Sequence, residues 1–347
     1  MTNLKKVGLT ALAGSLVAVS AQAGSLSVSG GAEISYTAQS HNASGTAQSI
    51  TNANGSRFGI EKYVSFNGSG ELDNGHTVSV FHGGPFGGSS SSTLTYDMGD
   101  MGSLTYVSAT LATGIKKIDD MMPSAYEEPT DGVDFTATAS GSGVKGVVGA
   151  NGSGFNYNTT LGMATIDLGY MPSGSNAEVD DGGVSGDASN AHVASTPSST
   201  SIAIQAAPMD GLNVFGGMGD MGQDRATEEY ENDHSTYGLT YTMGAVTVGY
   251  QHSEIDDNET GSTSNDTEAD MYGISFAVNE NLSVSYGYQE TEVGVGNTDQ
   301  EISGFAVGYS AGGMTIKAQR NEADQSVTTG TATPEYERTE ILVGFAF

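Results

Sequence analysis

The chain has 347 residues and a formal net charge of −30, and it contains neither cysteine nor tryptophan. This acidity excludes binding to the phosphate backbone of nucleic acids, and the lack of cysteine excludes disulfides and zinc–thiolate sites. The hydrophobic share of 37% is too low for a large packed core, yet 16 tyrosines and 11 phenylalanines argue against a disordered chain.

The N-terminal residues have the features of a secretory signal peptide. Lys5 and Lys6 precede an apolar run over 7–19, which closes on an Ala-Gln-Ala sequence that suits signal peptidase. The alternative is a transmembrane anchor, but the run falls short of the ~20 residues that a helical span needs. We therefore predict a cleaved signal peptide over 1–23 and a single domain over 24–347.

The rest of the chain alternates apolar and polar residues with a period of two. From Leu26 to Tyr36 one face is apolar or glycine, and the other is small and polar. Sixteen segments follow this pattern: 26–37, 56–71, 76–83, 91–98, 102–110, 154–161, 163–171, 200–207, 212–219, 235–243, 245–255, 269–278, 282–292, 301–310, 314–324 and 335–347. A rival segment, Val133–Ala139, is assigned to a loop, and counting it would change the number of strands by up to two.

The connections between these segments alternate between short and long. The short ones are tight turns such as Asp73-Asn74-Gly75. The long ones are polar: 38–55, 111–153, 172–199, 220–234, 256–268 and 325–334. Outer-membrane barrels have short periplasmic turns and long external loops, and their strands need only one apolar face. The sequence thus predicts an all-β fold, a transmembrane antiparallel β-barrel of about sixteen strands.

Three local stretches resemble the Gram-negative general porins, particularly the alphaproteobacterial ones. They are Ser56–Ile60 at the start of the second segment, the Asp73-Asn74-Gly75 hairpin, and the closing segment to Phe347. The resemblance implies a homotrimer of sixteen-stranded barrels, with the third external loop, here 111–153, folded into the lumen as a constriction. It also implies a cluster of wall arginines, and here the chain departs, since it has only Arg57, Arg225, Arg320 and Arg338.

Acidic residues gather in the predicted constriction loop, where we expect them to line the pore. They are Asp119, Asp120, Glu127, Glu128 and Asp131, preceded by the partly offsetting Lys116 and Lys117. Rings of Asp and Glu favour the passage of cations. The alternative interpretation is an acidic loop that is simply solvated.

Five charged residues of the strands are predicted to line the barrel wall, because alternation places them opposite apolar neighbours. They are Arg57, Glu61, Lys317, Arg338 and Glu340. An inward position avoids the cost of facing lipid, which is about 2–4 kcal/mol for Arg or Lys at the midplane. The alternative is that some of these residues are solvated at the rim.

The predicted function is passive diffusion of small hydrophilic solutes and ions through a water-filled channel in the outer membrane of a Gram-negative bacterium. Outer-membrane lipid and lipopolysaccharide are the expected surroundings. No catalytic constellation or cofactor site is evident, and the rival function is a non-channel barrel whose acidic loops act in adhesion or surface structure. Weak calcium binding is predicted at paired acids, with freely solvated loops as the alternative. These acids are Asp180, Asp181, Glu228, Glu229, Asp256 and Asp257.

Overall fold

Sixteen strands make up most of the described part of the chain in a computed structural model. The structure describes residues 24–41, 55–85, 91–109, 112–119, 121–131, 133, 154–172, 198–225, 228–257, 266–293, 300–325 and 335–346. The strands are β1 (Ser25–His41), β2 (Gly55–Glu71), β3 (Thr77–Pro85), β4 (Ser91–Asp97), β5 (Ser103–Ala109), β6 (Gly154–Leu161), β7 (Ala164–Met171), β8 (Ser199–Met209), β9 (Leu212–Arg225), β10 (Glu228–Met243), β11 (Val246–Asp257), β12 (Thr267–Ala277), β13 (Leu282–Val293), β14 (Gln300–Ala311), β15 (Met314–Gln325) and β16 (Glu335–Ala346).

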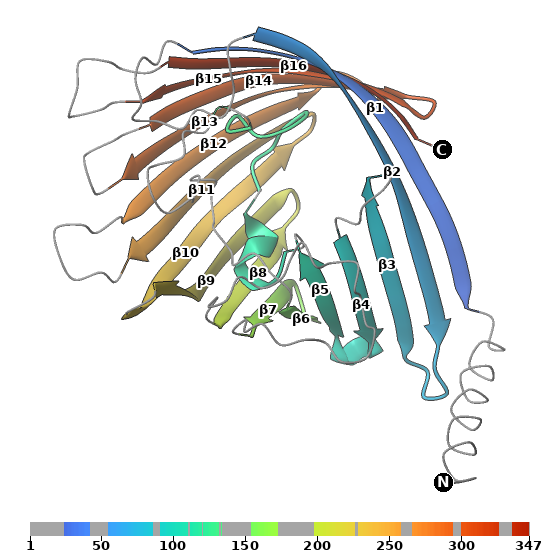
Figure 1. The fold of residues 1–347 in the computed structure, drawn as a ribbon. Helices are drawn as coiled ribbons and strands as arrows, with labels where there is room; N and C mark the ends of the chain where they lie inside the picture. The colour runs from blue at the N-terminus through green and yellow to red at the C-terminus, as the bar shows by residue number, and fades with distance from the viewer. Residues whose placement is uncertain are drawn as a thin grey trace, which may run out of the picture.

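The strands close into a barrel in which each strand pairs antiparallel with its sequence neighbours (Figure 1). The last strand pairs with the first, with Ile341 opposite Tyr36 and Val343 opposite Ile34. Closure gives every strand two partners, so the sheet has no free edge strand. The predicted all-β antiparallel barrel is therefore confirmed.

All sixteen predicted segments overlap the observed strands, but one predicted loop is wrong. The range 220–234 was expected to be a long connection, whereas β9 extends to Arg225 and β10 begins at Glu228. Their backbones pair in register, for example Asp220 with Asp233. Apolar alternation stops in this range while backbone pairing continues, because ladder hydrogen bonds do not require an apolar side chain on either face.

The alternation sorts side chains between the outside and the lumen. Phe58 and Ile60 of β2 point outward and expose 79% and 64% of their surface. Tyr250, Tyr272 and Tyr288 form a cross-strand row on the outer face, with ring centroids 5.2 and 6.3 Å apart along it. An outer face of this kind matches the apolar band and aromatic girdle that membrane barrels present to lipid.

Two short 3-10 helices, η1 (Gly99–Met101) and η2 (Gly114–Ile118), interrupt the strand pattern. In the described part of the chain, no helix combines the length and the apolar character needed to cross a membrane. The predicted signal peptide, 1–23, lies outside the described residues. Val133 lies in a turn and so belongs to the loop, whereas 134–139 also fall outside the description.

Candidate pore constriction

The described residues of the third external loop, 112–119, 121–131 and 133, follow the inner wall of the barrel; we call them the lumen segment. Figure 1 shows it inside the barrel, where η2 contacts β7, β8 and β9. Its first hydrogen bonds go to the wall, since Gly114 N donates to Asn156 Oδ1 at 2.8 Å and Ile115 N donates to Ser201 Oγ at 3.1 Å. The described part of this connection therefore lies against the wall inside the barrel.

An apolar anchor holds the start of the lumen segment. Ile115 and Ile118 of η2 expose 2% and 0% of their surface and pack with Ala203 and Phe215 of the wall. Fully burying an aliphatic side chain of this size contributes about 1.5–3 kcal/mol. The two isoleucines thus supply a substantial driving force for docking η2 on the wall.

A buried glutamine continues the attachment where η2 ends. Gln251 of β11 is fully buried, and its Nε2 donates to the carbonyl oxygen of Ile118 at 3.0 Å and to Thr236 Oγ1 at 3.1 Å. The last carbonyl groups of a helix lack partners within the helix. The wall side chain supplies such a partner here, so a polar residue fixes the exit of the chain from η2.

Glycines of the inner wall make room for the two prolines of the lumen segment. Gly249 and Gly273 lie beneath Pro123, and Gly287 and Gly304 lie beneath Pro129. A Cβ on Gly249 would stand 2.7 Å from Pro123 Cδ, and one on Gly304 would stand 2.8 Å from Pro129 Cα. Sequence reasoning missed this role, although glycine on the inward face of four successive strands, β11 to β14, was visible as a pattern.

Charged and amide side chains of β15 and β16 hold the end of the lumen segment. Arg338 pairs with both Asp131 and Glu340, and its side chain is 18% exposed. Gln319 Nε2 donates to Asp131 Oδ2 at 2.8 Å, and Asn321 Nδ2 donates to the carbonyl oxygen of Asp131 at 3.0 Å. We call Asp131, Arg338 and Glu340 the loop clamp.

Tyr126 links the middle of the lumen segment to the same strands. Its hydroxyl donates to Glu340 Oε1 at 2.8 Å, and Lys317 Nζ lies 4.9 Å from the centroid of its ring. Burial raises the pKa of the Tyr126 hydroxyl, and the hydrogen bond to Glu340 and nearby carboxylates raise it further. The hydroxyl therefore stays a donor well above neutral pH.

The five predicted wall residues fall into two groups. Lys317, Arg338 and Glu340 contact the lumen segment, as described above. Arg57 and Glu61 are instead exposed on the inner face of β2. The structure thus separates residues that hold the loop from residues that face open lumen.

Glu33 is an inward carboxylate that the sequence reasoning missed. It lies directly opposite Glu61 in the β1–β2 register, so the two carboxylates share the inner face. The signal was available, because Glu33 stands on the small, polar face of the first alternating segment. We call the inner faces of β1 and β2, with Glu33, Arg57 and Glu61, the open wall.

The predicted loop carboxylates do not form a single ring. Glu127 is exposed, Asp119 and Glu128 are partly exposed, and Asp131 pairs with Arg338 in the loop clamp. Asp120 lies outside the described residues. The described acids are therefore spread along the lumen segment, and at least one of them is used for attachment.

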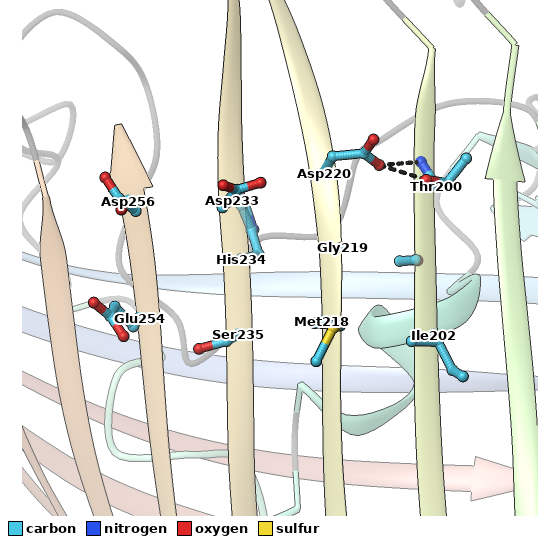
Figure 2. Close-up of a pocket in the computed structure, with 11 residues that line it drawn as sticks. Thr200, Ile202, Met218, Gly219, Asp220, Asp233, His234, Ser235, Glu254 and Asp256 are labelled. Atoms are coloured by element: carbon cyan, nitrogen blue, oxygen red, sulfur yellow. Dashed lines mark hydrogen bonds between the residues drawn. The ribbon is translucent and has the colours of Figure 1, made fainter. Parts of the chain in front are cut away.

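A row of aspartates crosses the outer face near the ends of β9, β10 and β11. Asp233 lies opposite Asp220 on one side and Asp256 on the other (Figure 2). Asp220 Oδ1 accepts from the backbone N and the hydroxyl of Thr200, at 2.7 and 2.6 Å. The row borders a depression of ≈ 700 Å³ whose other lining residues include Ile202.

The residues of the calcium prediction are only partly described. Asp256 belongs to the row above, whereas Glu228 and Glu229 lie in β10 and not in the expected loop. The side chains of Glu228, Glu229 and Asp257 are not described, and Asp180 and Asp181 lie outside the description altogether. Within the part of the chain that is described, no three His, Asp or Glu residues are grouped so as to hold a metal ion.

Comparison with protein-family models and with curated proteins found no match. Solved structures do match: a porin, at 13% identity and a TM-score of 0.62, over 93% of this chain and 100% of that one. An anion-selective porin from Comamonas acidovorans is 12% identical, with a TM-score of 0.61 and the same coverage. The trimer form of the Vibrio cholerae outer membrane protein OmpT is 11% identical, with a TM-score of 0.64, covering 94% and 100%. The chain therefore has the sixteen-stranded barrel fold of bacterial porins.

Proposed function

We propose that the protein is a porin that lets small hydrophilic solutes and ions diffuse passively across the outer membrane of a Gram-negative bacterium. The observation that carries this proposal is a closed barrel in which the lumen segment is fixed along part of the inner wall, while charged residues are exposed on the open wall. Such a lumen filters solutes by size and charge without chemical turnover. We assign it no catalytic role.

Liposome swelling tests this proposal directly. Purified protein is reconstituted, and swelling rates are measured in neutral sugars and polyols of increasing size, with heat-denatured protein as the control. We expect fast swelling for small solutes and a steep decline with size. Swelling no faster than in protein-free liposomes would overturn the proposal and favour a role in adhesion or surface structure.

We further propose that the channel prefers cations. Two features support this: Glu33 and Glu61 stand opposite each other on the open wall, and the charge of Arg338 is matched within the loop clamp. Carboxylates that face a narrow lumen attract cations directly. Reversal potentials in a KCl gradient test it, and a preference for chloride would show that Arg57 dominates the narrow zone.

The oligomeric state proposed is a homotrimer embedded in outer-membrane lipid and lipopolysaccharide. One of the structurally similar proteins is described as a trimer form, and the outer face here carries the apolar side chains and tyrosine row that suit a membrane. Electrophoresis of unheated and heated samples tests the trimer. A single unheated species at the monomer mass would contradict it.

Weak binding of calcium along the row of outer-face aspartates is also proposed. Like charges directly opposite each other destabilise a sheet, so calcium held loosely near Asp220, Asp233 and Asp256, and not in a tight metal site, would reduce the repulsion between the strands. Thermal unfolding is measured in EDTA and then in millimolar calcium at matched ionic strength. An unchanged midpoint, or an equal rise with Asp233→Asn, would remove this proposal.

A further inference from the structure

We propose that Arg338 is a positioning residue of the channel: the loop clamp fixes the lumen segment against β15 and β16 and thereby sets the aperture. This inference rests on the proposed channel function. It assigns Arg338 a role different from that of Arg57, although both are inward arginines. Arg338 is expected to act through the position of the loop, and Arg57 through its own charge in the lumen.

The local charges support this assignment. The guanidinium of Arg338 is paired with two carboxylates, Asp131 from the lumen segment and Glu340 from the same strand. The Arg338 side chain is only 18% exposed, and that of Glu340 is 10% exposed. With Lys317 close by, over the ring of Tyr126, positive and negative charges balance within the group. Little of the charge of Arg338 is left to act on a passing ion.

The contacts around Asp131 show how the loop clamp holds the lumen segment to the wall. Wall side chains hold Asp131 at two atoms, with Gln319 on its carboxylate and Asn321 on its backbone oxygen. Glu340 also accepts the hydroxyl of Tyr126, so both carboxylates that flank Arg338 are tied to the attachment of the loop. Without the guanidinium they would be two like charges at a partly buried site, which would repel the lumen segment from the wall.

Single-channel recording of Arg338→Gln and Arg57→Gln separates the two roles. Each substitution removes one positive charge from the inner face of the barrel. For Arg338→Gln we expect a rise of about tenfold in the time spent in reduced-conductance substates, because breaking a partly buried ion pair favours the displaced loop. For Arg57→Gln we expect quiet channels with a shifted reversal potential.

A disulfide tests whether loop position is the cause. The chain has no cysteine, and the hydroxyl oxygens of Ser124 and Ser285 lie 3.5 Å apart, so a Ser124→Cys/Ser285→Cys pair is placed to cross-link the lumen segment to β13. Added to Arg338→Gln, the oxidised pair is expected to restore quiet channels, and reduction to bring the substates back. Arg338→Lys should be intermediate, since lysine keeps the charge but lacks the planar fork.

Several results would overturn the inference. Quiet Arg338→Gln channels whose reversal potential shifts as much as in Arg57→Gln would show that Arg338 acts through its charge. Failure of the oxidised cysteine pair to restore quiet channels would do the same. If Arg338→Gln does not fold, Asp131→Asn replaces it, because it removes the lumen segment's side of the same ion pair, with the same expected substates and the same rescue.

The failure of the channel proposal is distinguishable from the failure of the clamp. A wild-type protein without conductance steps would refute the channel but leave the position of the loop measurable. The yield of the disulfide between the substituted Ser124 and Ser285, measured by mass spectrometry, should then fall several-fold when Arg338→Gln is added. An equal yield with and without Arg338→Gln would refute the clamp.

Discussion

The inner face of the barrel has the same alternating backbone all the way round, yet its two sides use that face differently. On the side of β6 to β16, glycines, buried amides and paired charges lie against the lumen segment. On the open wall, Arg57 and Glu61 are exposed to the lumen. An inward polar residue therefore either holds the loop or faces the solute, and alternation alone does not tell which.

The largest expected effect comes from the apolar anchor of the lumen segment. Ile118→Ala truncates a fully buried side chain, a change that typically destabilises by about 2–5 kcal/mol. Here the destabilisation should weaken the attachment of the lumen segment to the wall. Limited trypsin digestion of liposome-embedded protein should then cleave faster after Lys116 and Lys117. Phe81→Ala, on the inner face of β3 and away from this anchor, serves as the control. Equal protection in wild type and Ile118→Ala would refute the anchor.

Glycines on the two sides of the barrel are expected to differ in how well they tolerate a larger side chain. A Cβ on Gly304 would meet Pro129 Cα at 2.8 Å and Asn321 Oδ1 at 2.5 Å, whereas one on Gly59 of the open wall would meet only the hydroxyl of Ser35 at 2.8 Å. Overpacking costs about 1–3 kcal/mol where backbone must move. The midpoint temperature of thermal unfolding should therefore be lowered more by Gly304→Val than by Gly59→Val. A larger loss with Gly59→Val would contradict the difference between the walls.

A smaller effect is expected from the charges of the open wall. Glu61→Gln should reduce the cation preference, measured as a reversal potential in a KCl gradient. The shift should shrink between about 0.1 M and 1 M salt, as the Debye length falls from ~10 to ~3 Å. Glu337→Gln, on the outer face beside Arg320, is the matched control and should leave the reversal potential unchanged. Equal shifts from both variants would show a general charge effect.

The smallest effect concerns Tyr126. Its raised pKa means that it ionises at a higher pH than an ordinary tyrosine, which ionises near pH 10. Its contribution to stability is present below about pH 10 and is lost as the pH rises towards the folded pKa, because the unfolded chain releases the proton first. The absorbance of ionised tyrosine should rise identically in wild type and Tyr126→Phe up to about pH 11. If the absorbance rise near pH 10 were smaller in Tyr126→Phe by the share of one tyrosine, the raised pKa would be contradicted.

Much of the fold could be predicted from the sequence, because each strand has its own alternation of apolar and polar residues. Where the alternation stops, the prediction was wrong: β9 and β10 continue into the polar range 220–234. The same alternation predicted that Arg57 and Glu340 face inward, and it contained the overlooked Glu33. A local pattern was enough for these features, since facing is decided within one strand.

The architecture of the constriction could not be predicted in the same way. Asp131 and Arg338 are 207 residues apart, and Tyr126 and Glu340 are 214 apart, so no local pattern links them. The five loop acids look alike in the sequence, yet Asp131 is paired while Glu127 is exposed. Only the path of the lumen segment along the wall decides which acid meets an arginine.

Because the chain has no cysteine, single introduced cysteines can compare the covered wall with the open wall. Single cysteines are placed at Glu61 on the open wall and at Gln319 beneath the lumen segment, where Gln319 is only 3% exposed. A water-soluble, charged thiol reagent is then added during conductance recording. We expect Glu61→Cys to react rapidly and change the current, and Gln319→Cys to be protected. Equal reaction rates at the two positions would contradict a lumen with one covered and one open wall.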